Sequence, residues 1–133
     1  MTTENLKNWI KLQDAEFAGI LQLGGVDANA EKYLGIYPAG QAGGNAQICL
    51  GGLACTTTET LRARLLLRWG QAIPAAEAKA RKLWNYFAGL SDADMDGAHV
   101  YLADPGASPV FIGKDSCGVV EYVINLEIIC ERE

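Results

Sequence analysis

The chain has 133 residues, of which half are hydrophobic, a fifth are charged and 8% are aromatic. This composition is typical of one folded domain that buries its core without disulfides or a structural metal. Sixteen acidic and eleven basic residues give a net charge of −5, which argues against a double-stranded nucleic-acid binder with a broad basic surface. We therefore expect a single domain that covers residues 1–133.

The sequence contains no run of about 18 apolar residues, so we expect no membrane span. Its first residues show no basic stretch followed by an apolar stretch, so we expect no secretory signal. The spacing of the four cysteines, Cys49, Cys55, Cys117 and Cys130, matches no zinc or haem motif. We expect all four to be reduced thiols. Cys49 and Cys130 lie in apolar runs, where a thiol packs as a small hydrophobic group.

The first predicted element is a helix over residues 3–22, with Thr2 or Thr3 as its N-cap and Gly24-Gly25 as its stop. Its apolar residues recur at helical spacing: Leu6, Trp9, Ile10, Phe17, Ile20 and Leu21. Two short strands are predicted next, over 32–37 and 46–50. The loop between them, PAGQAGGN, is too small and polar to pack in a core, so we expect it to be exposed and mobile.

Strict alternation predicts a long strand over residues 57–69. One face carries Leu61, Ala63, Leu65, Leu67 and Trp69, and the other carries Arg62, Arg64, Leu66 and Arg68. After Gly70 the period changes, and helical spacing predicts a second helix over residues 74–88. The polar face of this helix, which we expect in water, carries Glu77, Lys79, Arg81, Lys82 and Asn85.

The segment SDADMDG, residues 91–97, is interpreted as a polar connection. A short strand over 99–103 and two further strands over 110–113 and 119–131 follow. The last strand alternates Val120, Tyr122, Ile124, Leu126, Ile128 and Cys130 with a face that carries Glu121, Asn125, Glu127 and Glu131. This order predicts an α+β fold, with a mostly antiparallel or mixed sheet of about five to six strands and two helices on one face.

No motif for catalysis or for a cofactor emerges, and we predict no catalytic, cofactor-binding or metal-binding residue. Asp92, Asp94 and Asp96 copy the first half of a calcium loop, but Ala103 occupies the position of the closing glutamate. His99 is the single histidine, and we expect it to be partly exposed and hydrogen-bonded. A nucleophilic pair of His99 and Cys117 would have to form in space, because the two are distant along the chain.

Charges line the faces of the two long strands, with Arg62, Arg64 and Arg68 on one and Glu121, Asn125 and Glu127 on the other. One interpretation is a cross-strand ladder on a solvated sheet surface, in which each pair contributes less than about 1 kcal/mol. The alternative is an interface in which the basic strip of one subunit meets the acidic strip of the next. The sequence leaves both open.

The C-terminal half, from TLRARLLLRWG through LWNYFAGL to PVFIGKDSCGVVEYVINLEIICERE, resembles the minor capsid or tail terminator proteins of long-tailed phages and prophages. The residues that match the motif of this family are Pro109, Ile112, Gly113, Lys114, Asp115, Gly118 and Asn125. The resemblance covers residues 56–133 and is carried by turn and strand residues.

The resemblance implies a structural virion protein without catalysis, made in the cytoplasm of the bacterial host. Its subunits would form a ring, generally a hexamer, at the head-proximal end of the tail tube. Such a ring stops polymerisation of the tube and joins the tail to the head connector, and DNA passes through it only as cargo. Two segments are candidate docking loops, and the residues concerned are Gly40, Gln41, Gly43, Gly44, Asn45, Asp92, Asp94 and Asp96.

Two alternatives remain. One is another head-tail joining protein or a tail tube subunit, which would have the same chemistry and a different neighbour. The other belongs to a different class: a small cytosolic α+β enzyme or ligand-binding domain, with a pocket near Trp84, Tyr86 and Tyr101.

Overall fold

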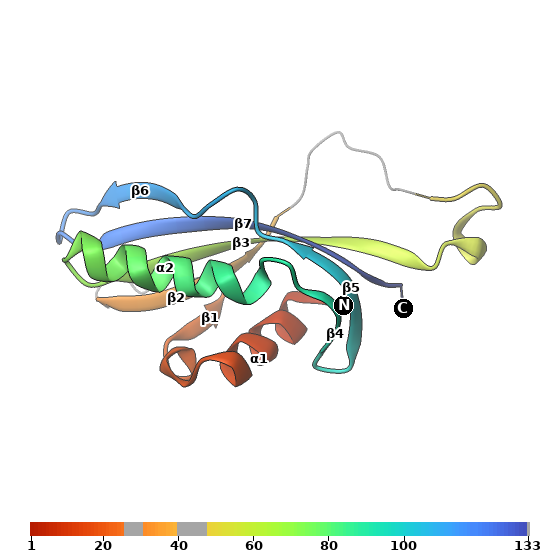
Figure 1. The fold of residues 1–133 in the computed structure, drawn as a ribbon, viewed down its shortest axis with the longest axis horizontal. Coiled ribbons are helices and arrows are strands. Elements are labelled where there is room, and N and C mark those ends of the chain that lie inside the picture. Colours follow the sequence, from red (N-terminus) through yellow and green to blue (C-terminus); the bar gives the residue numbers. More distant parts are fainter. Residues whose placement is uncertain (26–30, 40–47, 133) are drawn as a thin grey trace.

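A computed structural model describes residues 1–25, 31–39 and 48–132 (Figure 1). The two main helices are α1 (Thr3–Gln13) and α2 (Ile73–Phe87), and two short 3-10 helices are η1 (Ala15–Phe17) and η2 (Leu53–Cys55). The strands are β1 (Leu21–Leu23), β2 (Lys32–Pro38), β3 (Thr58–Trp69), β4 (Ser91–Met95), β5 (Ala98–Asp104), β6 (Val110–Lys114) and β7 (Val120–Glu131).

The seven strands form one mixed sheet in the order β1-β2-β3-β7-β5-β4, and β6 also pairs with β7. Only β1 and β2 are parallel; every other pair is antiparallel. The α+β prediction is therefore confirmed, although the sheet has more strands than expected. The additional strands are β1 and β4, which the sequence assigned to a helix and to a connection.

The two longest strands, β3 and β7, lie side by side at the centre of the sheet. They are paired along eleven residues, from Thr58 opposite Glu131 to Arg68 opposite Glu121. Alternation along each strand separates an inner apolar face from an outer polar face. The inner residues of β7 are all buried, and they are Val120, Tyr122, Ile124, Leu126, Ile128 and Cys130, as the alternation predicts.

Helix α1 is shorter than its apolar pattern suggests. It begins after Thr2, the predicted N-cap, whose backbone amide donates to Asn5 Oδ1 at 2.8 Å. It ends at Gln13 because Asp14 adopts an extended conformation and its carboxylate accepts from the Glu16 amide. The prediction of a helix up to residue 22 is wrong: Phe17 and Leu21 are buried by η1 and β1 instead.

Helix α2 closely matches its predicted bounds, with Pro74 in its first turn as expected. Ala76, Ala80, Leu83 and Phe87 form its buried stripe. The polar face differs from the prediction at one position, since Lys79 is buried with 7% of its surface exposed.

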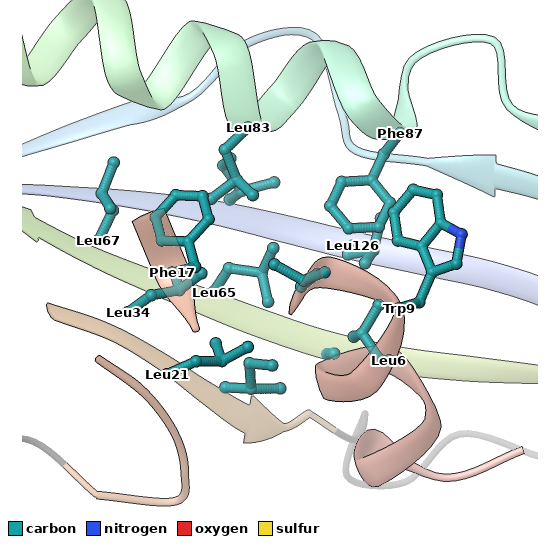
Figure 2. Packing of buried hydrophobic residues seen from close by; sticks show 14 of the residues in the cluster. Leu6, Trp9, Phe17, Leu21, Leu34, Leu65, Leu67, Leu83, Phe87 and Leu126 are labelled. Carbon is teal, nitrogen blue, oxygen red and sulfur yellow. The ribbon is translucent and has the colours of Figure 1, made fainter. Parts of the chain in front are cut away.

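Side chains from both helices meet over the inner face of the sheet in one hydrophobic cluster (Figure 2). The rings of Trp9 in α1 and Phe87 in α2 lie 5.2 Å apart, and both helices pack over the same face. Leu65 and Leu126 lie beneath them and are no more than 1% exposed.

Two further predictions fail. Residues 48–50 lie outside any strand, and the rest of the predicted strand over 46–50 lies outside the described residues. The SDADMDG segment is a strand and a tight turn, because Ser91–Met95 pairs with β5 and Asp96 and Gly97 close the hairpin with positive φ angles. Three aspartates in seven residues gave the segment the composition of a loop, but the pairing with β5 outweighs this local preference.

Replacing Leu65 by Ala should lower the free energy of unfolding by about 2–5 kcal/mol, because the side chain is buried and its removal leaves a cavity. Leu12→Ala is the matched control, since Leu12 is 80% exposed on α1. Urea unfolding monitored by circular dichroism measures both. Equal losses in the two variants would contradict the assignment of the inner face.

Candidate functional site

The outer face of the sheet is the side opposite the helices, and no described helix lies on it (Figure 1). The predicted strips of charge meet there within one chain. Their three side-chain contacts are Arg62 Nε to Glu127 Oε1 at 2.8 Å, Arg64 Nε to Asn125 Oδ1 at 3.2 Å and Arg68 Nη1 to Glu121 Oε1 at 3.4 Å. The register places the members of each pair directly opposite one another on β3 and β7.

The structure therefore shows the cross-strand ladder, which accounts for these six residues without a second subunit. Arg62 and Glu127 are 39% and 51% exposed at their side chains, so their pair contributes little to stability. An interface between subunits at the same residues stays a prediction.

The Arg68 end of the ladder differs because it is buried. The Arg68 side chain is 5% exposed and also contacts Asp115, in the turn between β6 and β7. Backbone amides of Val119 and Cys117 donate to the Asp115 carboxylate, and together with the Arg68 guanidinium they lower the pKa of Asp115. Arg68 thus ties this turn to the sheet.

Apolar side chains interrupt the outer face. Leu102 and Ile129 are opposite each other on β5 and β7 and are 45% and 38% exposed. Next to the Arg62–Glu127 pair is a groove of about 330 Å³, whose rim includes Asp104, Gly106 and Asn125. The outer face thus carries both ion pairs and part-exposed apolar side chains.

The alternative prediction places an enzyme pocket near Trp84, Tyr86 and Tyr101, and each of these side chains contacts another residue. Trp84 Nε1 donates to the Gly106 carbonyl at 3.2 Å, and Tyr86 donates to Asp14 at 3.1 Å. Tyr101 lies on β5 with its ring 4.8 Å from that of His99. None of the three lines the groove on the outer face.

Of the two predicted docking segments, the structure describes only the one that contains Asp92, Asp94 and Asp96. Gly40, Gln41, Gly43, Gly44 and Asn45 lie outside the described residues. The aspartates of the β4–β5 hairpin are engaged in the following contacts: Asp92 with His99 at 3.2 Å, Asp94 with the Gly97 amide at 2.8 Å, and Asp96 with Asn8 at 2.8 Å and Asn5 at 3.3 Å. Hydrogen bonds from Asn5 and Asn8 to Asp96 therefore attach the hairpin to α1.

His99 is partly exposed and paired, as predicted. Cys117 lies in the β6–β7 turn, beside the start of β7, whereas β5 pairs with the C-terminal half of β7. The two therefore form no nucleophilic pair. Among the described residues, no group of three or more His, Cys, Asp or Glu side chains is placed to hold a metal ion.

None of the four cysteines is in a disulfide, and Cys49, Cys55 and Cys117 are exposed. Cys130 is buried as predicted, but the prediction that Cys49 packs in an apolar environment is wrong, because it lies on an exposed turn. No helix in the described part of the chain is long and apolar enough to cross a membrane.

A buried cluster around Lys79 is the feature that sequence reasoning missed. Lys79 Nζ lies 2.7 Å from Asp14 Oδ2 and 3.4 Å from Glu16 Oε2. It also lies 4.6 Å from the centre of the Phe17 ring and 4.8 Å from that of Trp69, within the range of cation–π attraction. The cluster joins α2 to the segment that follows α1.

The carboxylate of Asp14 is charged within this cluster. Burial by itself favours the neutral acid, but hydrogen bonds from Lys79, the Glu16 amide and Tyr86 outweigh it and lower the pKa of Asp14. Burial and the hydrogen bond to Asp14 raise the pKa of Tyr86. Lys79 and Asp14 are both nearly inaccessible, so their contact holds α2 to the segment after α1.

Comparison with family models, with curated proteins and with solved structures finds no match for this chain. The outer face and the sheet edges are therefore the features from which a function can be inferred.

Lys79→Met should lower the free energy of unfolding by about 3 kcal/mol at neutral pH, because it removes the nearest cation from the buried charge of Asp14. Among the described residues, Asp14 then keeps only the largely exposed Lys82, at 3.7 Å, as a charged partner. Asp14→Asn/Lys79→Met should be less destabilised than Lys79→Met alone, because it removes both charges. Urea unfolding of the wild type, the single variants and the double variant measures this coupling.

The same pair predicts a pH dependence. Because the pKa of Asp14 is lower in the folded state than its usual 3.8, its contribution is complete above that value and is lost as the pH falls below it. The stability difference between wild type and Asp14→Asn should therefore shrink on acidification below about pH 4. A difference that stays constant down to pH 2 would contradict the ionised pair.

Proposed function

We propose that this chain is a structural subunit of a ring at the head-proximal end of the tail of a long-tailed phage or prophage. The ring stops polymerisation of the tail tube and joins the tail to the head connector. The observation that supports this proposal most directly is that no described helix covers the outer face of the sheet. Leu102 and Ile129 lie exposed there beside ion pairs. Such a surface suits contact with another protein.

The ionisable groups with shifted pKa support a structural role. Asp14 and Tyr86 belong to the buried contact between α2 and the N-terminal segment, and Asp115 belongs to the β6–β7 turn. The fourth group is Tyr122 in the core, whose pKa is raised by burial. None of these groups lines the groove on the outer face. An enzyme would concentrate perturbed groups in its concave site, so the outer face is better explained as a docking surface.

The partners follow from this role. They are further copies of the chain, a tail tube protein and a head-tail connector protein, and the location is the virion. DNA is cargo that passes through the channel of the ring. The net charge of −5 suits that passage, because an acidic lumen has little attraction for phosphate.

The test is the mass of the wild-type protein by light scattering, at low and high protein concentration and at two salt concentrations, with electron microscopy of the heaviest species. A closed ring with a mass several times 14.3 kDa is expected. A ring that dissociates in high salt would show that ion pairs contribute to the contact between subunits. A monomer under every condition, with no rings in the micrographs, would contradict the proposal.

A further inference from the structure

Strand β6 is an exposed apolar edge of the sheet. It pairs with β7 along one side, and no described strand lies along its other side. Three consecutive apolar residues, Val110, Phe111 and Ile112, are 48%, 51% and 56% exposed. An edge of this kind presents unpaired backbone groups together with apolar side chains, which is the arrangement that another chain can bind.

The other two edges of the sheet are protected. Strand β1 has only three residues, and β4 carries Asp92 and Asp94, both exposed. Short edge strands and charged edge residues are two devices by which proteins avoid pairing with other chains. Strand β6 has five residues and an irregularity in its pairing with β7 between Phe111 and Gly113, but its first four residues carry no charge. Its apolar start is therefore the part of the sheet edge suited to association.

A second apolar surface lies on residues 48–56, which we call the apical segment. Ile48, Leu50 and Leu53 are 51%, 101% and 53% exposed. The segment is nevertheless attached to the end of β7, because Arg132 Nη1 donates to the carbonyls of Leu53 and Thr56. Within the segment, the Thr56 hydroxyl donates to the Gly52 carbonyl at 3.0 Å. It therefore presents apolar side chains on a defined backbone.

These two surfaces lie at opposite ends of the long axis of the molecule, with β6 at the left and the apical segment at the far right in Figure 1. They cannot cover one another within a single subunit. Their charged neighbours are complementary: exposed Lys114 ends β6, while exposed Glu131 ends β7 opposite Thr58, directly after the apical segment. The apical segment itself has no charged residue, and neither have the first four residues of β6.

We propose that the apical segment of one copy binds the β6 edge of the next copy, head to tail. Leu50 and Leu53 of one copy then pack against Phe111 and Ile112 of the next, and Glu131 pairs with Lys114. A second copy is the partner that covers both surfaces at once, and such a heterologous contact closes into a ring when the rotation between copies permits it. This inference rests on the proposed ring and names its contact surfaces.

The test uses Leu50→Asp and Ile112→Asp, which alter the apical segment and the β6 edge separately. Both side chains are more than half exposed, so both variants should fold as the wild type does. Leu12→Asp, on α1, is the matched control. Each test variant alone should weaken self-association at least about tenfold and run as a monomer in sedimentation, whereas Leu12→Asp should assemble as the wild type does.

Mixing the two test variants is the decisive step. The Leu50→Asp copy keeps an intact β6 edge and the Ile112→Asp copy keeps an intact apical segment, so the mixture contains one functional contact. We expect a species of twice the 14.3 kDa chain mass and no larger assembly. If Leu50→Asp alone still dimerises while Ile112→Asp does not, then β6 pairs with itself and the head-to-tail contact is wrong.

Charge reversal tests the ion pair independently. Lys114→Glu and Glu131→Lys should each weaken association, and the double variant should regain it because the pair is restored with opposite polarity. A wild-type ring combined with test variants that assemble equally well would overturn this contact and leave the proposed ring intact. A wild-type monomer at every concentration would overturn both.

Discussion

The fold depends on the antiparallel pairing of β3 with β7. Eleven consecutive residue pairs hold these two strands together at the centre of the sheet. Because side chains alternate across a strand, this one register decides the content of both faces. It directs Leu65, Leu67, Ile124 and Leu126 to the helices, and it sets each arginine of β3 opposite a carboxylate or amide of β7. A shift by one residue would turn the arginines toward the helices and Leu65 and Leu67 away from them.

The helices are fastened to this sheet by the apolar cluster and, at one point, by charge. Lys79 reaches from α2 to Asp14 at the end of α1, and its ammonium group lies 4.6 and 4.8 Å from the ring centres of Phe17 and Trp69. Breaking a buried pair by removing one member costs much more than an exposed pair contributes. The Asp14–Lys79 pair is therefore important to the packing of α2, whereas the exposed Arg62–Glu127 pair mainly keeps the outer face polar.

The surfaces that we propose for association lie where the helices and the strand pairing end. The outer face has ion pairs and apolar groups side by side, while the two ends of the molecule carry apolar surfaces of different kinds. At one end an edge strand offers unpaired backbone groups, and at the other a fixed turn offers leucines. A subunit with different surfaces at its two ends is suited to heterologous association, because each copy can contact a neighbour on both sides.

The sequence by itself determined what local periodicity can encode. The alternation of Ala63, Leu65 and Leu67 with arginines defined β3 and its two faces, the alternation in 120–131 defined β7, and helical spacing with Pro74 defined α2. The arginines and carboxylates could also be assigned to one face each. Which partner each would meet could not be known, because strand neighbours and register depend on residues about sixty positions apart.

Only the tertiary structure decided the rest. The apolar residues after Gln13 continue the spacing of α1, yet they reach the core through η1 and β1, since Asp14 leaves the helix to bind Lys79 and the Glu16 amide. The helical pattern predicts that Lys79 faces solvent, but in the structure a carboxylate and two aromatic rings from other elements contact its ammonium group. The aspartates of β4 predict a loop from composition, but the segment pairs with β5 as a strand. In each case the deciding contact is distant in sequence, and a local pattern cannot encode a partner that folding alone brings near.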